Sequence, residues 1–207
     1  MKRALLLGDY KSAQWHSMRG VDEELRRILE GFDLTITEDY PYLRLEDLQS
    51  YDFVVNYIDA WNRRAGADFA GALIGYVAAG GALLTLHGGI IARTSPEVEQ
   101  MIGGAFQGHP NHEVLEYVYA GAHPIMNAVD SFSIDEEPYQ FEMDPLARVH
   151  VIMDYVYHDQ RYPAAWLRGY GSGKSCYLSM GHEAASFANE GCARLVRRSA
   201  LWCAGEL

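Results

Sequence analysis

The stretch GGALLTLHGG, residues 80–89, is an apolar run between two pairs of glycines that ends on a histidine, His87. An uninterrupted run of this length, bounded by glycines, is typical of a strand buried on both faces, and we predict a strand over residues 82–87. Gly88 then allows the backbone to turn sharply and a substrate to approach closely. His87 is therefore expected at the carboxyl end of a buried strand, where α/β proteins bind their ligands.

Similar apolar strands alternate with helical patterns through the first half of the chain. We predict strands over residues 3–8, 32–37, 51–57 and 82–87, and helices over 21–30, 69–79 and from Pro96 onward. This alternation indicates a mostly parallel sheet covered by helices on both faces. After Glu113 the pattern changes to antiparallel strands, before a last strand within residues 174–182 and a helix over 184–203. Since the chain contains no linker or repeat, we expect a single α/β domain, residues 1–207.

Composition narrows the possible partners. A net charge of −11 disfavours nucleic acid, whose phosphates require clustered Lys and Arg. No apolar stretch approaches 18 residues, so no membrane span is expected. Three cysteines without a CxxC spacing favour reduced thiols in the cytoplasm. Four tyrosines expected at the surface hint at a homo-oligomer: Tyr40, Tyr42, Tyr117 and Tyr119.

A second histidine has the same setting as His87. His182 follows the last predicted strand and a glycine, and precedes Glu183 and a helix. The carboxyl ends of parallel strands meet at one edge of a sheet, so both imidazoles are expected in one crevice. The simpler alternative is that each ring only hydrogen-bonds a loop carbonyl.

Two further segments carry groups that can do chemistry. His109, His112 and Glu113 are metal-ligand types, although their spacing is not HExxH and Pro110 disfavours a helix; His109 can instead face the pocket. The segment IDEEPYQF crowds together acids that can supply a general acid or base, or that simply form an acidic surface hairpin.

Several well-known sites are absent from the sequence. The Gly-rich segment at residues 169–173 precedes a strand rather than a helix, so we predict a hairpin turn and not a phosphate loop. The sequence has no GxSxG elbow, no cysteine elbow, and no GxGxxG after the first strand. Serine esterase chemistry and dinucleotide-dependent hydride transfer are therefore not supported, and the sequence leaves the cofactor unknown.

Five segments in order resemble the trehalose-utilisation (ThuA-like) family: VAAGGALLTLHGG, IGGAFQGHPNHE, AHPIMNAVDSFSIDEEPY, PAAWLRGYGSGKSCYLSMGHE and LVRRSALWCAGE. The resemblance implies the flavodoxin-like three-layer sandwich of class I glutamine amidotransferases. It also implies a role in the metabolism of disaccharides, partly through 3-keto sugars. In the amidotransferases a cysteine nucleophile stands near the place of His87, so glutamine hydrolysis is not expected here.

These observations lead to a hypothesis of proton transfer on a disaccharide or 3-keto sugar, a reaction of the isomerase, lyase or hydrolase type. His87 and His182 would be the base and the acid, and Glu137 would orient one of them. The sugar would be bound by the following residues: His16, Gly88, His109, Tyr139 and Trp166. Two alternatives remain open: a non-catalytic sugar-binding or assembly module, and a hydrolase that uses zinc held by some of His16, His87, His109 and His182. The sequence leaves open whether a metal is bound.

Overall fold

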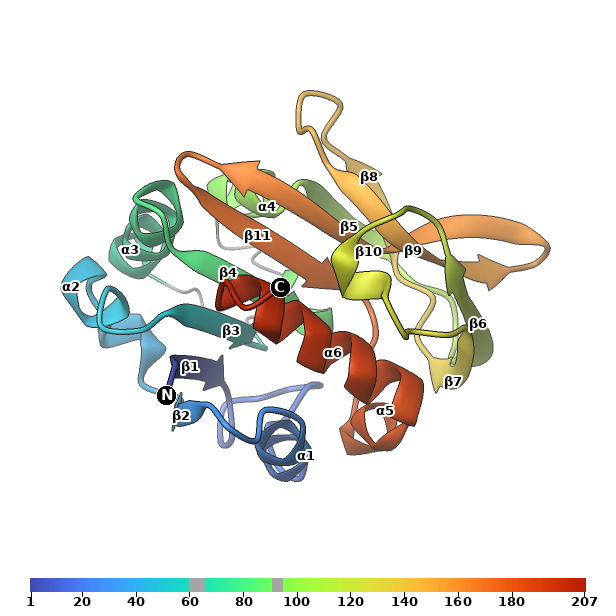
Figure 1. Ribbon diagram of the computed structural model, residues 1–207, viewed down its shortest axis with the longest axis horizontal. Coiled ribbons are helices and arrows are strands. Elements are labelled where there is room, and N and C mark those ends of the chain that lie inside the picture. Colours follow the sequence, from blue (N-terminus) through green and yellow to red (C-terminus); the bar gives the residue numbers. More distant parts are fainter. Residues whose placement is uncertain (60–65, 91–94) are drawn as a thin grey trace.

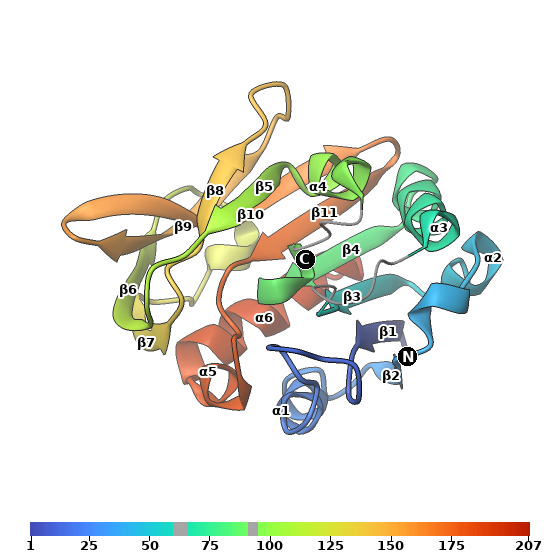
Figure 2. The same cartoon turned by 180° about the vertical axis from the view of Figure 1, so that it is seen from behind.

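The protein is built on one large twisted sheet, shown in Figures 1 and 2. The computed structural model describes residues 1–59, 66–90 and 95–207, and within them nine strands lie in the order β2-β1-β3-β4-β11-β10-β9-β6-β7. Those strands are β1 (Arg3–Gly8), β2 (Asp33–Thr37), β3 (Phe53–Tyr57), β4 (Ala82–Leu86), β6 (Glu113–Tyr119), β7 (Phe132–Glu136), β9 (His150–Tyr157), β10 (Gln160–Tyr170) and β11 (Gly173–Leu178). Separately, β5 (Gly104–Gly108) pairs with β8 (Gln140–Met143) in an antiparallel ribbon.

The large sheet is parallel in one half and antiparallel in the other. The pairs from β2 through β1, β3 and β4 to β11 are parallel, and those from β11 through β10, β9 and β6 to β7 are antiparallel. The expectation of a mostly parallel sheet is therefore right only for the first half. The reversal occurs at the predicted hairpin turn, where β10 leads into β11 and Gly171 adopts a φ of 58°.

Helices cover both faces of the parallel half. They are α1 (Val21–Ile28), α2 (Leu45–Leu48), α3 (Ala67–Ala78), α4 (Pro96–Ile102), α5 (Ala184–Ala188) and α6 (Glu190–Cys203). Residues of α1, α5 and α6 pack with Leu6 on one face, and residues of α2, α3 and α4 pack with Leu5 and Leu7 on the other. Since successive side chains of a strand point to opposite faces, both sets of β1 side chains are buried. This double burial is the reason that its sequence is an unbroken apolar run.

The last helix differs from its prediction. One helix was expected over residues 184–203, but the chain forms α5 and α6 with a break at Asn189. The Asn189 side-chain oxygen accepts hydrogen bonds from the backbone N–H groups of Gly191 and Cys192 at 2.9 and 3.2 Å. Asparagine is a preferred N-cap, so it starts a new helix here instead of continuing the old one.

Burial also corrects the surface expected from the sequence. Tyr40 and Tyr117 are fully buried, whereas Tyr42 and Tyr119 are 82% and 52% exposed. Only the latter two are available for contacts with another chain. The three cysteines are buried and unpaired. In the described part of the chain, every helix is too short or too polar to cross a bilayer.

The carboxyl edge of the parallel strands is the place where the ends of distant segments meet. β1, β3, β4 and β11 are parallel neighbours, so the residues that follow each of them lie along one edge of the sheet. The connection between β7 and β8 brings Glu137 over the same edge, where it contacts His87.

Candidate functional site

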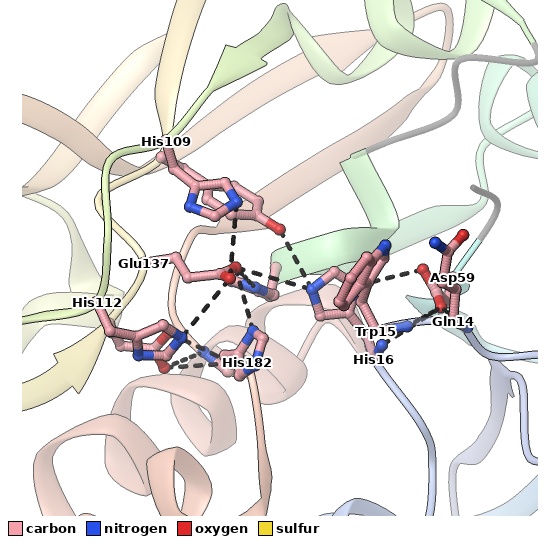
Figure 3. A network of polar contacts seen from close by, with 12 residues as sticks. Gln14, Trp15, His16, Asp59, His109, His112, Glu137 and His182 are labelled. Atoms are coloured by element: carbon pink, nitrogen blue, oxygen red, sulfur yellow. Dashed lines mark hydrogen bonds and ion pairs between the residues drawn. The ribbon is translucent and has the colours of Figure 1, made fainter.

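Glu137 is the centre of a cluster of histidines at this edge (Figure 3). Among the described residues, five imidazoles lie within 3.8 Å of its carboxylate. Its Oε2 atom is 3.1 Å from Nδ1 of His182, 3.2 Å from Nε2 of His87 and 3.8 Å from Nε2 of His16. Its Oε1 atom is 3.6 Å from Nε2 of both His109 and His112. The cluster brings His87 and His182 together at one edge of the sheet, as expected, and it adds three more rings.

His87 is fixed rigidly at the end of β4. It begins the 3-10 turn His87–Ile90 with a φ of 39°, in the left-handed region that costs a residue with a side chain roughly 1–2 kcal/mol. Its Nδ1 lies 2.6 Å from the carbonyl oxygen of Ser179, and its ring stacks on Tyr139 with 4.2 Å between centroids. Burial lowers the pKa of His87, although Glu137 opposes this. Because both ring nitrogens are engaged and the ring is fully buried, His87 supports Glu137 rather than facing a substrate.

His16 is held from behind by Asp59, the residue that follows β3 by two positions. The Nδ1 atom of His16 lies 3.3 Å from Oδ1 of Asp59, and its Nε2 lies 3.4 Å from the Tyr139 hydroxyl. Burial acts to lower the pKa of His16, but the carboxylates of Asp59 and Glu137 raise it overall. Gly88 is buried against this ring, and a Cβ there would lie 2.5 Å from Nδ1 of His16. Gly88 thus makes room for His16, not for a sugar as predicted.

Asp59 also shapes the loop that carries His16. Its Oδ2 atom accepts hydrogen bonds from the backbone N–H groups of Gln14, Trp15 and His16 at 2.5, 2.8 and 3.3 Å. Burial acts to raise the pKa of Asp59, but the His16 imidazole and these N–H donors lower it overall. One ionised carboxylate therefore sets both the loop and the ring.

Glu136, beside the central carboxylate, fixes His182 in the same manner. Its buried carboxylate accepts hydrogen bonds from the backbone N–H groups of Gly181 and His182 at 2.8 and 3.2 Å. The Tyr57 hydroxyl donates to the His182 carbonyl at 3.0 Å. The alternative of an acidic surface hairpin is therefore wrong for Glu136 and Glu137, and holds only for the exposed Asp135.

The charge state of the cluster follows from its neighbours. Burial acts to raise the pKa of Glu137, but the imidazoles of His16, His182 and His87 lower it far below its usual range, so the carboxylate is ionised. Burial raises the pKa of Tyr139 well above 10, which keeps its hydroxyl protonated as a hydrogen-bond donor.

A cavity of about 450 Å³ opens beside the cluster. Of the described residues, it is lined by Gln14, Trp15, His16, His109, Glu137 and Tyr139. Trp15 is 61% exposed, so its indole face is available to a ligand. The Nδ1 atom of His109 lies 2.8 Å from its neighbour's carbonyl oxygen, to which it donates, leaving Nε2 as an acceptor near Glu137.

Two other predicted assignments are corrected by packing. Trp166 is fully buried, donates its indole N–H to the Ile102 carbonyl at 2.9 Å, and packs on Tyr177. It is a core residue and not a surface on which a sugar could stack. The sequence-adjacent set of His109, His112 and Glu113 also does not form, because Glu113 lies near His158 while both histidines turn toward Glu137.

The cluster has the ligand types of a metal centre. One atom each from His16, His87, His182 and Glu137 can be chosen so that all four lie within 4.8 Å of one another. Imidazole nitrogen and carboxylate oxygen are the donors that Zn²⁺ and similar ions take in proteins.

Sequence reasoning missed three residues that shape this site. Asp59 follows a predicted strand just as His87 does, so the same strand-end argument would have found it. Glu136 stands in an acidic run of the sequence, and its burial depends on the packing of β7. Trp15 lies in a loop between β1 and α1 with no periodic signal.

The family of the chain is decided by a direct comparison. A family model described as trehalose utilisation, ThuA, matches residues 6–203. The chain belongs to the trehalose-utilisation (ThuA) family. The resemblance seen in the sequence is confirmed. None of the curated proteins compared with the chain matches it.

Solved structures share the fold of this family member. A putative ThuA-like protein from Parabacteroides merdae superposes with a TM-score of 0.81 at 17% identity, over 98% of this chain and 90% of that one. A second putative ThuA-like protein, from Bacteroides uniformis, superposes with a TM-score of 0.78 at 17% identity, over 98% of this chain and 91% of that one. A β-galactosidase from Rahnella sp. R3 superposes with a TM-score of 0.69 at 13% identity. The match covers 91% of this chain but only 30% of the β-galactosidase chain. The mixed α/β fold is thus shared with ThuA-like proteins and with part of a larger glycosidase.

Proposed function

We propose that the chain is an enzyme of carbohydrate metabolism that moves protons on a disaccharide or 3-keto sugar bound in the cavity beside Glu137. The observation that carries this proposal is an ionised carboxylate ringed by five imidazoles at the wall of a cavity with an exposed tryptophan. Membership of the trehalose-utilisation family supports a sugar as the substrate.

His109 is the general base in this proposal. Its Nδ1–H is committed to a backbone carbonyl, so Nε2 is the atom that can accept a proton. Oε1 of Glu137, 3.6 Å away, would stabilise the imidazolium that forms, as a carboxylate does beside a catalytic histidine. The base role expected of His87 passes to His109, because His87 is buried and His109 lines the cavity.

Proton transfer at this place suits a ketone substrate. A carbonyl acidifies the neighbouring C–H bond, and the Tyr139 hydroxyl can donate a hydrogen bond to the oxygen as charge develops there. Return of the proton from His109 to the former carbonyl carbon, with the neighbouring hydroxyl becoming the new carbonyl, gives an isomerisation. Transfer of that proton to an oxygen that leaves from one carbon further away gives an elimination. Trp15 would hold the apolar face of the sugar ring, the role that the sequence suggested for Trp166.

The fold proposal is finer than the shared α/β class. We infer the flavodoxin-like three-layer arrangement of class I glutamine amidotransferases, supported by helices on both faces of the parallel half. A histidine replaces the cysteine at the end of β4, and Cys176, Cys192 and Cys203 are buried. Thioester chemistry on glutamine is therefore not proposed.

Unpaired cysteines favour a location in the cytoplasm. A homo-oligomer would form through surfaces that include Tyr42 and Tyr119, which are exposed.

The test is proton NMR in D₂O with native and 3-keto disaccharides. Wild-type protein should exchange a proton next to the ketone or cleave the sugar, and His109→Ala should lose this activity. His158→Asn is the matched control: it removes an exposed imidazole outside the cluster, and asparagine tolerates the left-handed φ of 48° at that turn. Sugar signals that shift on binding without exchange would instead establish the non-catalytic binding module. If the protein neither binds nor turns over any of these sugars, the proposal is refuted.

A further inference from the structure

We propose that His16, His87, His182 and Glu137 bind one divalent transition-metal ion, with Zn²⁺ as the ion that best suits three imidazoles and one carboxylate. The inference does not depend on the identity of the substrate and goes beyond the proton transfer proposed above. It rests on the positions of four ligand atoms and on the hydrogen bonds behind them.

The four atoms lie within 4.8 Å of one another, and two of the three nitrogens are already at the spacing from Oε2 that an ion requires. Ligand atoms around tetrahedral Zn²⁺ lie about 3.3 Å apart, because each bond is about 2.0–2.1 Å long. Oε2 of Glu137 lies 3.1 Å from Nδ1 of His182 and 3.2 Å from Nε2 of His87. The third nitrogen, Nε2 of His16, lies farther from Oε2, at 3.8 Å. The loop that carries His16 would therefore move about 0.5 Å toward Glu137 when the ion binds.

Two of the rings are oriented as metal ligands are. A ligating histidine donates its other N–H to a carbonyl or a carboxylate, which fixes the tautomer and turns the lone pair inward. Nδ1 of His87 does so toward the carbonyl of Ser179 at 2.6 Å, and a carbonyl can only accept. Nδ1 of His16 does so toward Asp59 at 3.3 Å. In His87, Nε2 is left facing Glu137, and in His16 it faces Glu137 and the Tyr139 hydroxyl.

The third ring carries a buried nitrogen that needs a partner. Nδ1 of His182 is buried and makes no hydrogen bond with the described residues, although it points at Glu137 from 3.1 Å. Its backbone is held by Glu136, so the ring is placed by the fold and does not drift there. The contact with Glu137 lacks the geometry of a hydrogen bond, which is costly for a buried nitrogen, and a metal bond would remove that cost.

Protons alone do not satisfy this arrangement well. Three nitrogens converge on the single atom Oε2. With Glu137 and Asp59 both ionised, three imidazolium rings would still leave one uncompensated positive charge in a mostly buried cluster. Neutral rings, in turn, would leave lone pairs facing a carboxylate. One divalent ion accepts a lone pair from every ligand at once and carries the opposite charge to the carboxylate.

The ion would also have access to a ligand from the cavity. His16 and Glu137 line the cavity, while His87 is buried behind them. Zinc can expand from four ligands to five, so a fifth position on the cavity side would accept a carbonyl or hydroxyl oxygen, the donor groups of a sugar. His109 and His112 contact the other carboxylate oxygen and stay outside the set.

The experiment is metal analysis of protein purified without a histidine tag, followed by removal of metal with EDTA and titration with Co²⁺. One ion per chain and a saturable visible Co²⁺ spectrum are expected. His182→Ala and the isosteric Glu137→Gln should weaken Co²⁺ binding about 100-fold or more, whereas His158→Asn should bind as wild type does. Far-UV circular dichroism checks that both cluster variants fold, and Glu137→Gln keeps the shape of the side chain.

Separate outcomes judge the two proposals. His109→Ala should keep the Co²⁺ spectrum while it loses turnover. If wild-type protein shows no saturable Co²⁺ binding, or if both cluster variants bind it unchanged, the metal site is refuted whatever the NMR assay shows. If the ion binds but no sugar is bound or turned over, the metal site stands and the proposed reaction fails.

Discussion

Replacing Asp59 by asparagine removes a buried charge while keeping the size of the side chain. In the native protein, Oδ2 accepts from the backbone N–H groups of Gln14 and Trp15 at 2.5 and 2.8 Å, and from that of His16 at 3.3 Å. The amide oxygen of asparagine can still accept these bonds, but without charge assistance. Hydrogen bonds to a charged group contribute about 1.5–3 kcal/mol, and neutral ones about 0.5–1.5 kcal/mol. The two short bonds therefore predict a loss of about 2 kcal/mol in the free energy of unfolding.

The pH dependence of this difference identifies the charge as its cause. The pKa of Asp59 is lowered in the folded protein, so its contribution is present above the unfolded pKa of about 3.9. It is lost as the pH falls through the lower folded pKa. Urea unfolding of wild type and Asp59→Asn should thus differ by about 2 kcal/mol from pH 7 to about pH 4, and by less below that.

The control for this experiment is Asp135→Asn, which neutralises an exposed carboxylate two residues from the central glutamate. Its unfolding free energy should stay within about 0.5 kcal/mol of wild type. A difference for Asp59→Asn below about 0.5 kcal/mol at pH 7, or one that persists undiminished at the lowest pH, would refute the reasoning.

Three further substitutions have clear expected outcomes. Trp166→Ala should lower the unfolding free energy in urea by about 3–5 kcal/mol, because the indole is fully buried; a change under about 1 kcal/mol would contradict its core role. Trp15→Ala should leave stability within about 0.5 kcal/mol, yet raise the dissociation constant of a bound sugar about tenfold in calorimetry, from roughly 50 Å² of lost apolar contact. In metal-free protein, the raised pKa of His16 means that its stabilisation is complete below about pH 6.5 and is lost as the pH rises through the folded pKa. Urea unfolding of wild type against His16→Gln from pH 5 to pH 9 should show a shrinking difference, and saturating Zn²⁺ should reverse this trend, since protons compete with the ion.

Local pattern was enough to predict the parallel half of the fold. The strand expected at residues 3–8 is β1 with the same bounds, and the helices expected near 21–30 and 69–79 are α1 and α3. These elements are buried on a regular face, so their periodicity reports their environment directly. The position of His87 after β4 and of His182 after β11 followed from the same rule, because parallel strands end at a common edge.

The antiparallel half and the short ribbon of β5 and β8 were harder to read. Their strands are partly exposed, and a break such as Asn189 within a helical pattern is visible only once its cap is formed. The burial of tyrosines is also not readable from local sequence, since Tyr40 and Tyr42 lie two residues apart and only Tyr42 is exposed. Burial at such positions is decided by what packs over them.

The sequence by itself determined the fold class, the family and the edge of the sheet where a site would lie. Only the tertiary structure decided that Glu137, fifty residues after His87, would become the centre of that site. The same holds for Trp15, which faces the cavity, and Trp166, which fills the core. The physical reason is that periodicity records which side of a strand or helix is buried, whereas a site is made where loops from distant strands converge. Whether such loops come together depends on how distant segments pack, and no local sequence pattern records that packing.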